Sequence, residues 1–161
     1  MKKLLLLLTV LSFSFISCED DDRPPLKMRA TNFAQNFFFD AEETGATENA
    51  DGTFTIVGIA DVGVITLTIS GPQEGEYPLT NSDVNFATYS FNGVEYSTRG
   101  QASGTGNVRI ERWNPGARTV TGRFIFEAFN GSDGIRFDSG DFDNVSYAAS
   151  ANTDGDEGDG N

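Results

Sequence analysis

Apolar and polar residues alternate along much of the chain with a period of two. In residues 65–69 (ITLTI), isoleucine and leucine fall on one face and threonine on the other. In residues 119–129 (TVTGRFIFEAF), the same alternation points Val120, Phe124 and Phe126 inward. A period of two with β-branched and aromatic residues is typical of half-buried β-strands. Further segments that we expect to form strands are residues 53–59, 108–111 and 134–142.

Two turns between these segments are marked by their residue types. Asn92-Gly93 favours a two-residue hairpin turn, because a type I′ turn needs positive φ at both central positions. Pro115-Gly116 marks a second turn, within residues 113–118 (WNPGAR). Counting outward from the first turn predicts three cross-strand pairs: Phe91 with Val94, Ser90 with Glu95, and Tyr89 with Tyr96.

Residues 30–43 (ATNFAQNFFFDAEE) are compatible with two structures. Phe33, Phe37 and Ala41 lie at helical spacing, whereas three consecutive phenylalanines favour a strand buried on both faces. We expect a strand. The whole pattern then predicts an all-β fold, either a single antiparallel β-sandwich or an open β-barrel, with about eight to ten short strands.

The amino terminus has the layout of an export signal. Lys2 and Lys3 precede an uncharged, mainly apolar run (LLLLLTVLSFSFIS). This run is shorter than the roughly 18 to 20 apolar residues that a membrane-spanning helix needs, so it fits a secretory signal peptide better. We therefore predict a signal peptide over residues 1–17.

The cysteine that follows this run suggests how the protein is anchored. Residues 15–18 (FISC) resemble the lipobox of bacterial lipoproteins, in which the cysteine sulfur receives a diacylglycerol. We expect lipidation of Cys18, because the cysteine stands directly at the end of the apolar run. The two or more acyl chains of such a lipoprotein would give stable membrane attachment. The next residues resemble an acidic signal that exports lipoproteins to the cell surface; they are Glu19, Asp20, Asp21 and Asp22. A solvated charge run that extends the linker is the alternative interpretation.

These features divide the chain into four parts. Residues 18–30 form an acidic linker that Pro24-Pro25 keeps extended, and residues 31–149 form the β domain. Residues 150–161 contain glycine and acids, so they bury too little apolar surface to order and are expected to be a disordered tail.

Composition excludes several classes of function. The formal net charge is −13, which disfavours nucleic acid and anionic headgroups as ligands. The chain contains no histidine, the commonest general base and metal ligand, so a Ser-His-Asp triad is excluded. With one cysteine, no disulfide forms within the chain. We expect no cofactor.

Several motifs together resemble a known group of proteins. They are GEYPL (residues 75–79), SGTGNVRIERWNPGARTVTGRFIFEA (residues 103–128) and DSGDFDNVSY (residues 138–147). Over residues 28–147 the chain is similar to small Bacteroidota lipoproteins with a β-rich domain of unknown function. The shared residues are turn glycines and core aromatics, so the resemblance implies a fold and an outer-membrane location and provides no catalytic residues.

Acidic residues offer two candidate sites. Paired carboxylates could serve a glycosidase, but Glu42-Glu43 and the pair Glu74 and Glu76 lie in turn-like sequence. A cluster of oxygen ligands within residues 138–144 is a candidate calcium site, although turns in which Asp and Asn bond their own backbone have the same composition. The residues of this cluster are Asp138, Asp141, Asp143 and Asn144.

Aromatic residues are the main candidates for ligand binding. Tyrosine and tryptophan offer a large stacking surface with a polar end, which suits sugars and peptides. The same side chains could instead belong to the core, with their polar ends at the surface. The candidate binding residues are Tyr77, Tyr89, Tyr96, Arg99, Arg112 and Trp113.

We therefore expect a non-enzymatic surface lipoprotein that is attached to the membrane by its lipid and binds a glycan, a peptide or a partner protein. A structural or accessory subunit of an outer-membrane complex is the second hypothesis, and a hydrolase is the third. An exposed aromatic patch would favour ligand binding, whereas an unpaired hydrophobic edge strand would favour subunit assembly.

Overall fold

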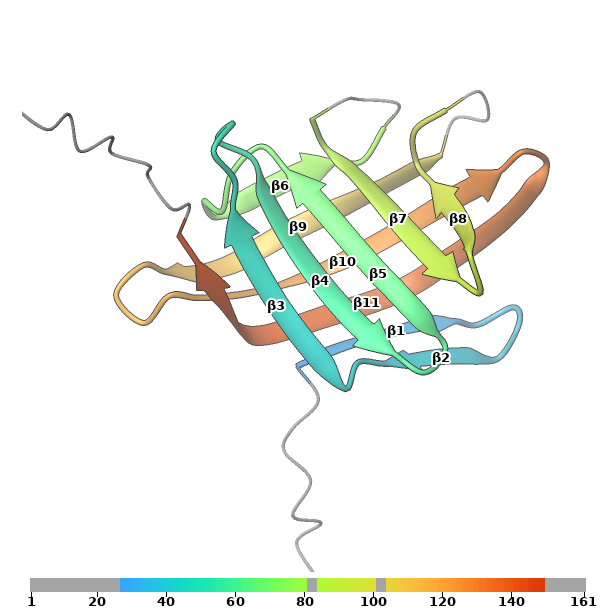
Figure 1. Ribbon diagram of the computed structural model, residues 1–161, viewed down its shortest axis with the longest axis horizontal. Helices are drawn as coiled ribbons and strands as arrows, with labels where there is room; N and C mark the ends of the chain where they lie inside the picture. Colours follow the sequence, from blue (N-terminus) through green and yellow to red (C-terminus); the bar gives the residue numbers. More distant parts are fainter. Residues whose placement is uncertain (1–26, 81–83, 101–103, 150–161) are drawn as a thin grey trace, which may run out of the picture.

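The computed structural model describes residues 27–80, 84–100 and 104–149, and these residues form one all-β domain (Figure 1). Its strands are β1 (Met28–Asn32), β2 (Phe37–Asp40), β3 (Glu43–Glu48), β4 (Phe54–Ala60), β5 (Gly63–Ile69), β6 (Gly75–Pro78), β7 (Phe86–Phe91), β8 (Val94–Ser97), β9 (Thr105–Asn114), β10 (Thr119–Asn130) and β11 (Asp133–Ala148). The predicted fold class is confirmed, with one strand more than the expected range.

The strands form a single sheet that folds into two layers. A front layer contains β3, β4, β5, β7 and β8, and a back layer has the order β2-β1-β11-β10-β9-β6. The back strands cross behind the front strands at a steep angle (Figure 1). The arrangement therefore combines the two predicted architectures: it is layered like a sandwich, and its sheet is continuous around a ring without forming a regular barrel.

Two short contacts join the layers. At one corner β11 pairs with β3 in parallel, through Tyr147 and Ala46. At the other corner β10 pairs with β8 through Phe129 and Ser97. The parallel pairing departs from the expected purely antiparallel sheet. It forms because the long strand β11 continues past β1 and meets the edge of β3.

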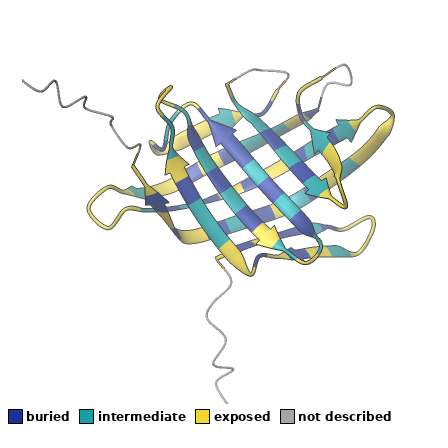
Figure 2. Ribbon diagram, viewed as in Figure 1, coloured by how far each residue is buried: buried dark blue, intermediate teal, exposed yellow. Residues whose placement is uncertain are grey.

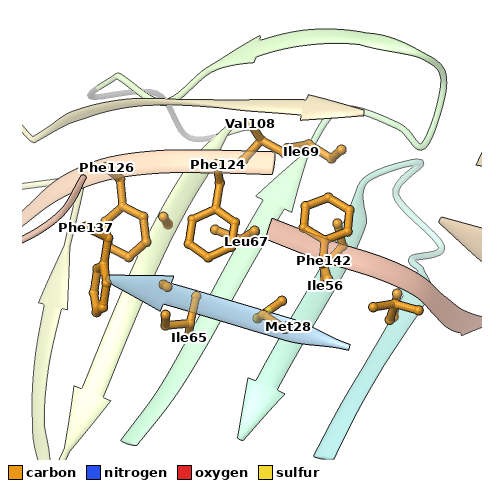
Figure 3. Close-up of a cluster of buried hydrophobic side chains, with 14 of the residues drawn as sticks. Met28, Ile56, Ile65, Leu67, Ile69, Val108, Phe124, Phe126, Phe137 and Phe142 are labelled. Carbon is orange, nitrogen blue, oxygen red and sulfur yellow. The ribbon is translucent and has the colours of Figure 1, made fainter. Parts of the chain in front are cut away.

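The inward faces of both layers form one hydrophobic core (Figure 2). Ile65, Leu67 and Ile69 on β5 are fully buried, as the alternation predicted. Phenylalanines from the back layer point at them across the interior (Figure 3). The largest fully buried side chains are Phe39, Phe54, Phe124, Phe137, Phe142, Met28, Ile56, Ile65, Leu67, Ile69, Leu79 and Ile110.

The hairpin prediction is confirmed in detail. β7 and β8 pair in the predicted register. Asn92 and Gly93 have φ of 50° and 80°, as a type I′ turn requires. Burial along the hairpin falls toward its turn: Tyr89 is buried, whereas Phe91 and Val94 are 43% and 44% exposed.

Three assignments differ from the sequence interpretation. β1 begins at Met28, so three residues assigned to the linker 18–30 belong to the sheet. The segment 30–43 is extended, as expected, but it makes two strands joined by a turn at residues 33–36. Trp113 lies within β9 and not in the following turn, because β9 extends to Asn114.

Several predictions concern parts of the chain that the structure does not describe. The signal peptide 1–17, Cys18, the acids at 19–22 and the tail 150–161 all lie outside the described residues. Within the described ranges, no helix is long and apolar enough to cross a membrane.

Candidate functional site

The outward face of the back layer carries a row of charges that crosses six strands. Side chains at paired positions of neighbouring strands lie on the same face, so the strand register determines this row. In spatial order it contains Glu76 on β6, Arg109 on β9, Arg123 on β10, Asp141 on β11, Arg29 on β1 and Asp40 on β2. We call this surface the back-layer face.

Most of these charges have a partner. The Arg109 guanidinium lies 3.5 Å from the Glu76 carboxylate, and Arg29 lies 3.5 Å from Asp141. Arg123 forms an ion pair with Glu111, the neighbour of Ile110 on β9. Asp40 makes no ion pair with any other described residue. Because the pairs are exposed, each contributes about 0–1 kcal/mol to stability, so the row adds little to the stability of the fold.

Three large apolar side chains are exposed beside this row. Ile125 on β10 is 50% exposed, between the outward positions of Arg123 and Glu127. Phe38 on β2 is 58% exposed, and Phe33, at the start of the β1–β2 turn, is 70% exposed. The Phe33 backbone N–H donates to Asp138 at 3.0 Å, which holds the turn against β11. Exposed apolar side chains with polar residues around them are a feature of protein-interaction surfaces.

Shallow grooves meet at Ile125. One of about 350 Å³ is lined by Glu76, Asn107, Arg109, Arg123, Phe124 and Ile125. A smaller one, of about 110 Å³, is lined by Thr105, Gly106, Ile125, Phe126, Glu127, Arg136, Phe137 and Asp138. The guanidinium of Arg136 pairs with Asp138 at 2.5 Å beside the second groove. The surface is hollowed on both sides of one exposed aliphatic side chain.

The predicted aromatic binding residues do not form one surface. Tyr89 is 4% exposed, its hydroxyl donates to the carbonyl of Val62, and its ring packs against Phe37 and Phe137. Tyr96 lies 6.2 Å from Tyr89, ring centre to ring centre. These two tyrosines are brought together, but as part of the core and its margin.

The other aromatic candidates are held by local contacts. Trp113 donates from Nε1 to the Tyr147 hydroxyl at 3.0 Å, and Tyr147 packs edge-on against Phe54 at 5.4 Å. Tyr77 on β6 donates its hydroxyl to the carbonyl of Gln73 at 2.7 Å, and partial burial raises its pKa. These contacts agree with the alternative interpretation, in which the rings are core residues with their polar ends near the surface.

The two arginine candidates lie apart from one another. The Arg99 guanidinium stacks 3.6 Å from the ring centre of Phe86, after the end of β8. Arg112 is exposed on β9, opposite Thr121 of β10. Neither lies in the charge row.

A comparison with protein families identifies the domain. A family model described as "Domain of unknown function (DUF6252)" matches residues 29–146. The chain belongs to this family. No curated protein and no solved structure matches the chain. The matched range covers the DUF6252 domain from β1 almost to the end of β11.

The candidate calcium ligands point to different partners in the DUF6252 domain. Asp138 accepts from Phe33 and pairs with Arg136, Asp141 pairs with Arg29, and Asp143 accepts from the Thr121 hydroxyl at 3.1 Å. Asn144 donates its side-chain amide to Asp143. Among the described residues, no group of three acidic or cysteine side chains could hold a metal ion.

The carboxylates on the back-layer face do not form a buried acid-base pair. A groove of about 380 Å³ is lined by Glu74, Gly75, Glu76, Arg109, Ile110 and Glu111. Glu76 and Glu111 each pair with an arginine there, and their side chains are 60% and 33% exposed. A glycosidase acid needs an environment that raises its pKa, usually by burial. No carboxylate in the described part of the DUF6252 domain is buried.

Sequence reasoning missed Phe33, Phe38 and Ile125. A usable signal was present, because three consecutive phenylalanines on a strand cannot all face the same way. Phe39 is buried, so its neighbour Phe38 has to point outward. Ile125 likewise alternates with the buried Phe124 and Phe126.

Proposed function

We propose that the chain is a lipoprotein of the bacterial outer membrane whose DUF6252 domain is a non-enzymatic binding module at the cell surface. The back-layer face binds a partner protein or an extended peptide. The anchor is the acylated sulfur of Cys18, and the acids at 19–22 direct surface display. This part of the proposal rests on the lipobox-like sequence and the acidic run that follows it.

The single observation that carries the binding role is the composition of the back-layer face. Ile125, Phe33 and Phe38 are exposed next to a register-matched row of six charges. Exposed apolar side chains provide most of the binding energy of an interface, and surrounding charges provide specificity and orientation.

A protein or peptide suits this surface better than a glycan. Sugar recognition uses exposed aromatic faces that carry a polar end, as tyrosine and tryptophan do. Three of the four candidates of that kind, Tyr77, Tyr89 and Trp113, direct their polar ends to partners within the domain. Among the described residues, the exposed aromatic side chains are phenylalanines, which have no polar end.

A role as an accessory subunit of an outer-membrane complex is the second candidate. It is supported by the outer edge of β2, which pairs with no other described strand and contains three phenylalanines. The two candidates differ in whether the partner is a stable complex or a transient ligand.

The anchor is tested with a Cys18→Ser variant of the full chain. We expect the wild-type chain to partition into the detergent phase and its mass to include acyl groups. The variant should leave the membrane fraction. An unmodified cysteine in membrane-derived protein, or a variant that stays with the membrane, would refute the anchor.

The binding face is tested by photocrosslinking in intact cells. A photoreactive residue is introduced into the full chain at Ile125 or, as a matched control, at Ile59. Both isoleucines are exposed, at 50% and 43%, but Ile59 lies on β4 in the front layer. We expect a discrete crosslinked product from position 125 and none from position 59. Equal products from both positions, or none from 125, would contradict the proposed face.

A further inference from the structure

Two strands lie at the ends of the strand order, and they differ in what their free edges offer. β2 ends the sheet on one side and β6 on the other, and no described strand pairs with the outer edge of either. An edge strand with unpaired N–H and C=O groups is a template for pairing with another chain.

Hydrogen-bond alternation shows which backbone groups of β2 are free. The Ala41 N–H donates to the Met28 carbonyl at 2.9 Å, so this pair is of the hydrogen-bonded type. In an antiparallel ladder every second residue faces the partner strand. Phe39 therefore turns its N–H and C=O toward β1, and Phe38 and Asp40 turn theirs toward the open edge.

The same reasoning shows that β6 is a poor template. The Leu79 N–H donates to the Gly106 carbonyl at 2.9 Å, so the outward groups of β6 belong to Glu76 and Pro78. Proline has no backbone N–H, and proline in an edge strand commonly prevents pairing with another strand. β6 thus lacks a donor where β2 has one.

The side chains of β2 define the chemistry of an added strand. Phe38 and Asp40 point to the back-layer face. Phe38 is 58% exposed there, and Asp40 ends the charge row without an ion pair to any residue in the described ranges. A residue opposite Phe38 should be apolar, and a residue opposite Asp40 should be a cation, which continues the row.

We propose that the edge of β2 binds an extended peptide segment of a partner protein as an additional antiparallel strand, with an apolar residue opposite Phe38 and an arginine or lysine opposite Asp40. The inference rests on the proposed binding function and specifies its partner. The added strand exchanges hydrogen bonds with the N–H and C=O of Phe38 and Asp40.

A second copy of the chain fits this edge less well. Consider two copies whose β2 strands pair antiparallel about a two-fold axis at Phe38, with their exposed faces on the same side of the sheet. Phe38 of one copy then lies opposite Phe38 of the other, and Asp40 lies opposite the partner's Asn36. Asp40 then gains no cation. The net charge of −13 also makes two copies repel each other, whereas it attracts a basic segment.

The test uses the full chain in detergent and an end-blocked nine-residue peptide. The peptide alternates threonine and valine, with one arginine two residues N-terminal to the central valine. We expect binding, measured by calorimetry. N-methylation of the valine and arginine amides that face β2 should weaken it about tenfold or more. N-methylation of the intervening threonines, whose amides face away, should change affinity less than about twofold.

Variants of β2 test the same register from the protein side. Phe38→Pro removes the outward N–H but no bond to β1, and we expect it to weaken peptide binding about tenfold with an unchanged fold by circular dichroism. Phe38→Ala keeps the N–H and removes only the side chain, which separates the two contributions. Asp40→Asn should weaken binding severalfold at low salt and remove most of its salt dependence.

The inference is overturned if Phe38→Pro, folded, binds the peptide like the wild type, if both methylation patterns act equally, or if the peptide does not bind. Dimerisation of the full chain that Phe38→Pro abolishes would assign the edge to a second copy and also overturn it. If crosslinking from Ile125 persists while the edge variants have no effect, the proposed binding face stands and only the added strand is rejected.

Discussion

Among single residues, Tyr89 shows how the fold converts a candidate ligand-binding side chain into part of the core. Its ring is buried between Phe37 and Phe137, and its hydroxyl donates to the Val62 carbonyl. Burial, with a smaller contribution from the neighbouring Tyr96, raises the pKa of Tyr89 above its ordinary value of 10.0. The neutral phenol is therefore favoured in the folded state.

This shift predicts how stability changes at alkaline pH. A pKa that is raised on folding contributes stability that is present below pH 10 and is lost as pH rises through the folded pKa. At pH 8, the Tyr89→Phe variant should have a free energy of unfolding about 1 kcal/mol lower than the wild type, because it lacks the hydrogen bond of the phenol. Above pH 10 the difference between wild type and variant should shrink, as measured by urea unfolding at each pH. Parallel stability curves for the two proteins would contradict this account.

At the scale of elements, the back layer depends on close contact between strands. Gly122 lies on β10 opposite Ile110 of β9, next to an irregularity in the register. A methyl group at Gly122 would lie 2.2 Å from the Arg109 carbonyl oxygen and 2.6 Å from the Phe142 ring. Glycine, which has no Cβ, therefore allows the β9 backbone and the Phe142 ring of β11 to lie this close to β10.

We therefore predict that Gly122→Ala destabilises the domain by about 1–3 kcal/mol, through overpacking. Gly45→Ala is the control. Gly45 also lies in a strand, β3, but a methyl group there would meet nothing within 4 Å. Its variant should keep wild-type stability within about 0.5 kcal/mol or be slightly more stable. Chemical unfolding measures both, and a Gly122 variant as stable as the Gly45 variant would argue against the strand approach.

At the scale of the whole molecule, the two layers share one core but have different surfaces. Of the described basic residues, Arg99 follows β8, whereas Lys27 and the other arginines lie in or beside the back layer. The outward face of the front layer is instead rich in threonine, with rows such as Thr55 opposite Thr68 and Thr66 opposite Thr88. The described basic side chains therefore lie mainly on one side of the domain.

The shared core predicts that both layers unfold together. Phe137 is fully buried and packs against Phe126, Phe37 and Tyr89, which come from both layers. Phe137→Ala should lower the free energy of unfolding by about 3–5 kcal/mol. Phe38→Ala, at an exposed position, should lower it by less than about 1 kcal/mol. Trp113 fluorescence and far-ultraviolet circular dichroism should report one coincident transition. Two separate transitions would show that the layers fold independently.

The sequence by itself determined the local features. Alternation predicted the strands, because the two faces of a strand are set by consecutive residues, and Asn92-Gly93 predicted the β7–β8 register, because the turn type determines pairing over a few residues. The inward positions of Val120, Phe124 and Phe126 were predictable for the same reason.

Only the tertiary structure decided which distant strands are neighbours. The parallel contact of β11 with β3, the exposed edge of β2 and the charge row from Glu76 to Asp40 depend on pairings between residues far apart in sequence. Nothing in Arg29 or Asp141 alone indicates that they are paired, since a shift of one residue in either strand would place one of them on the opposite face. The aromatic candidates were left with two interpretations for the same reason: whether a ring faces solvent or core is determined by the layer that packs over it.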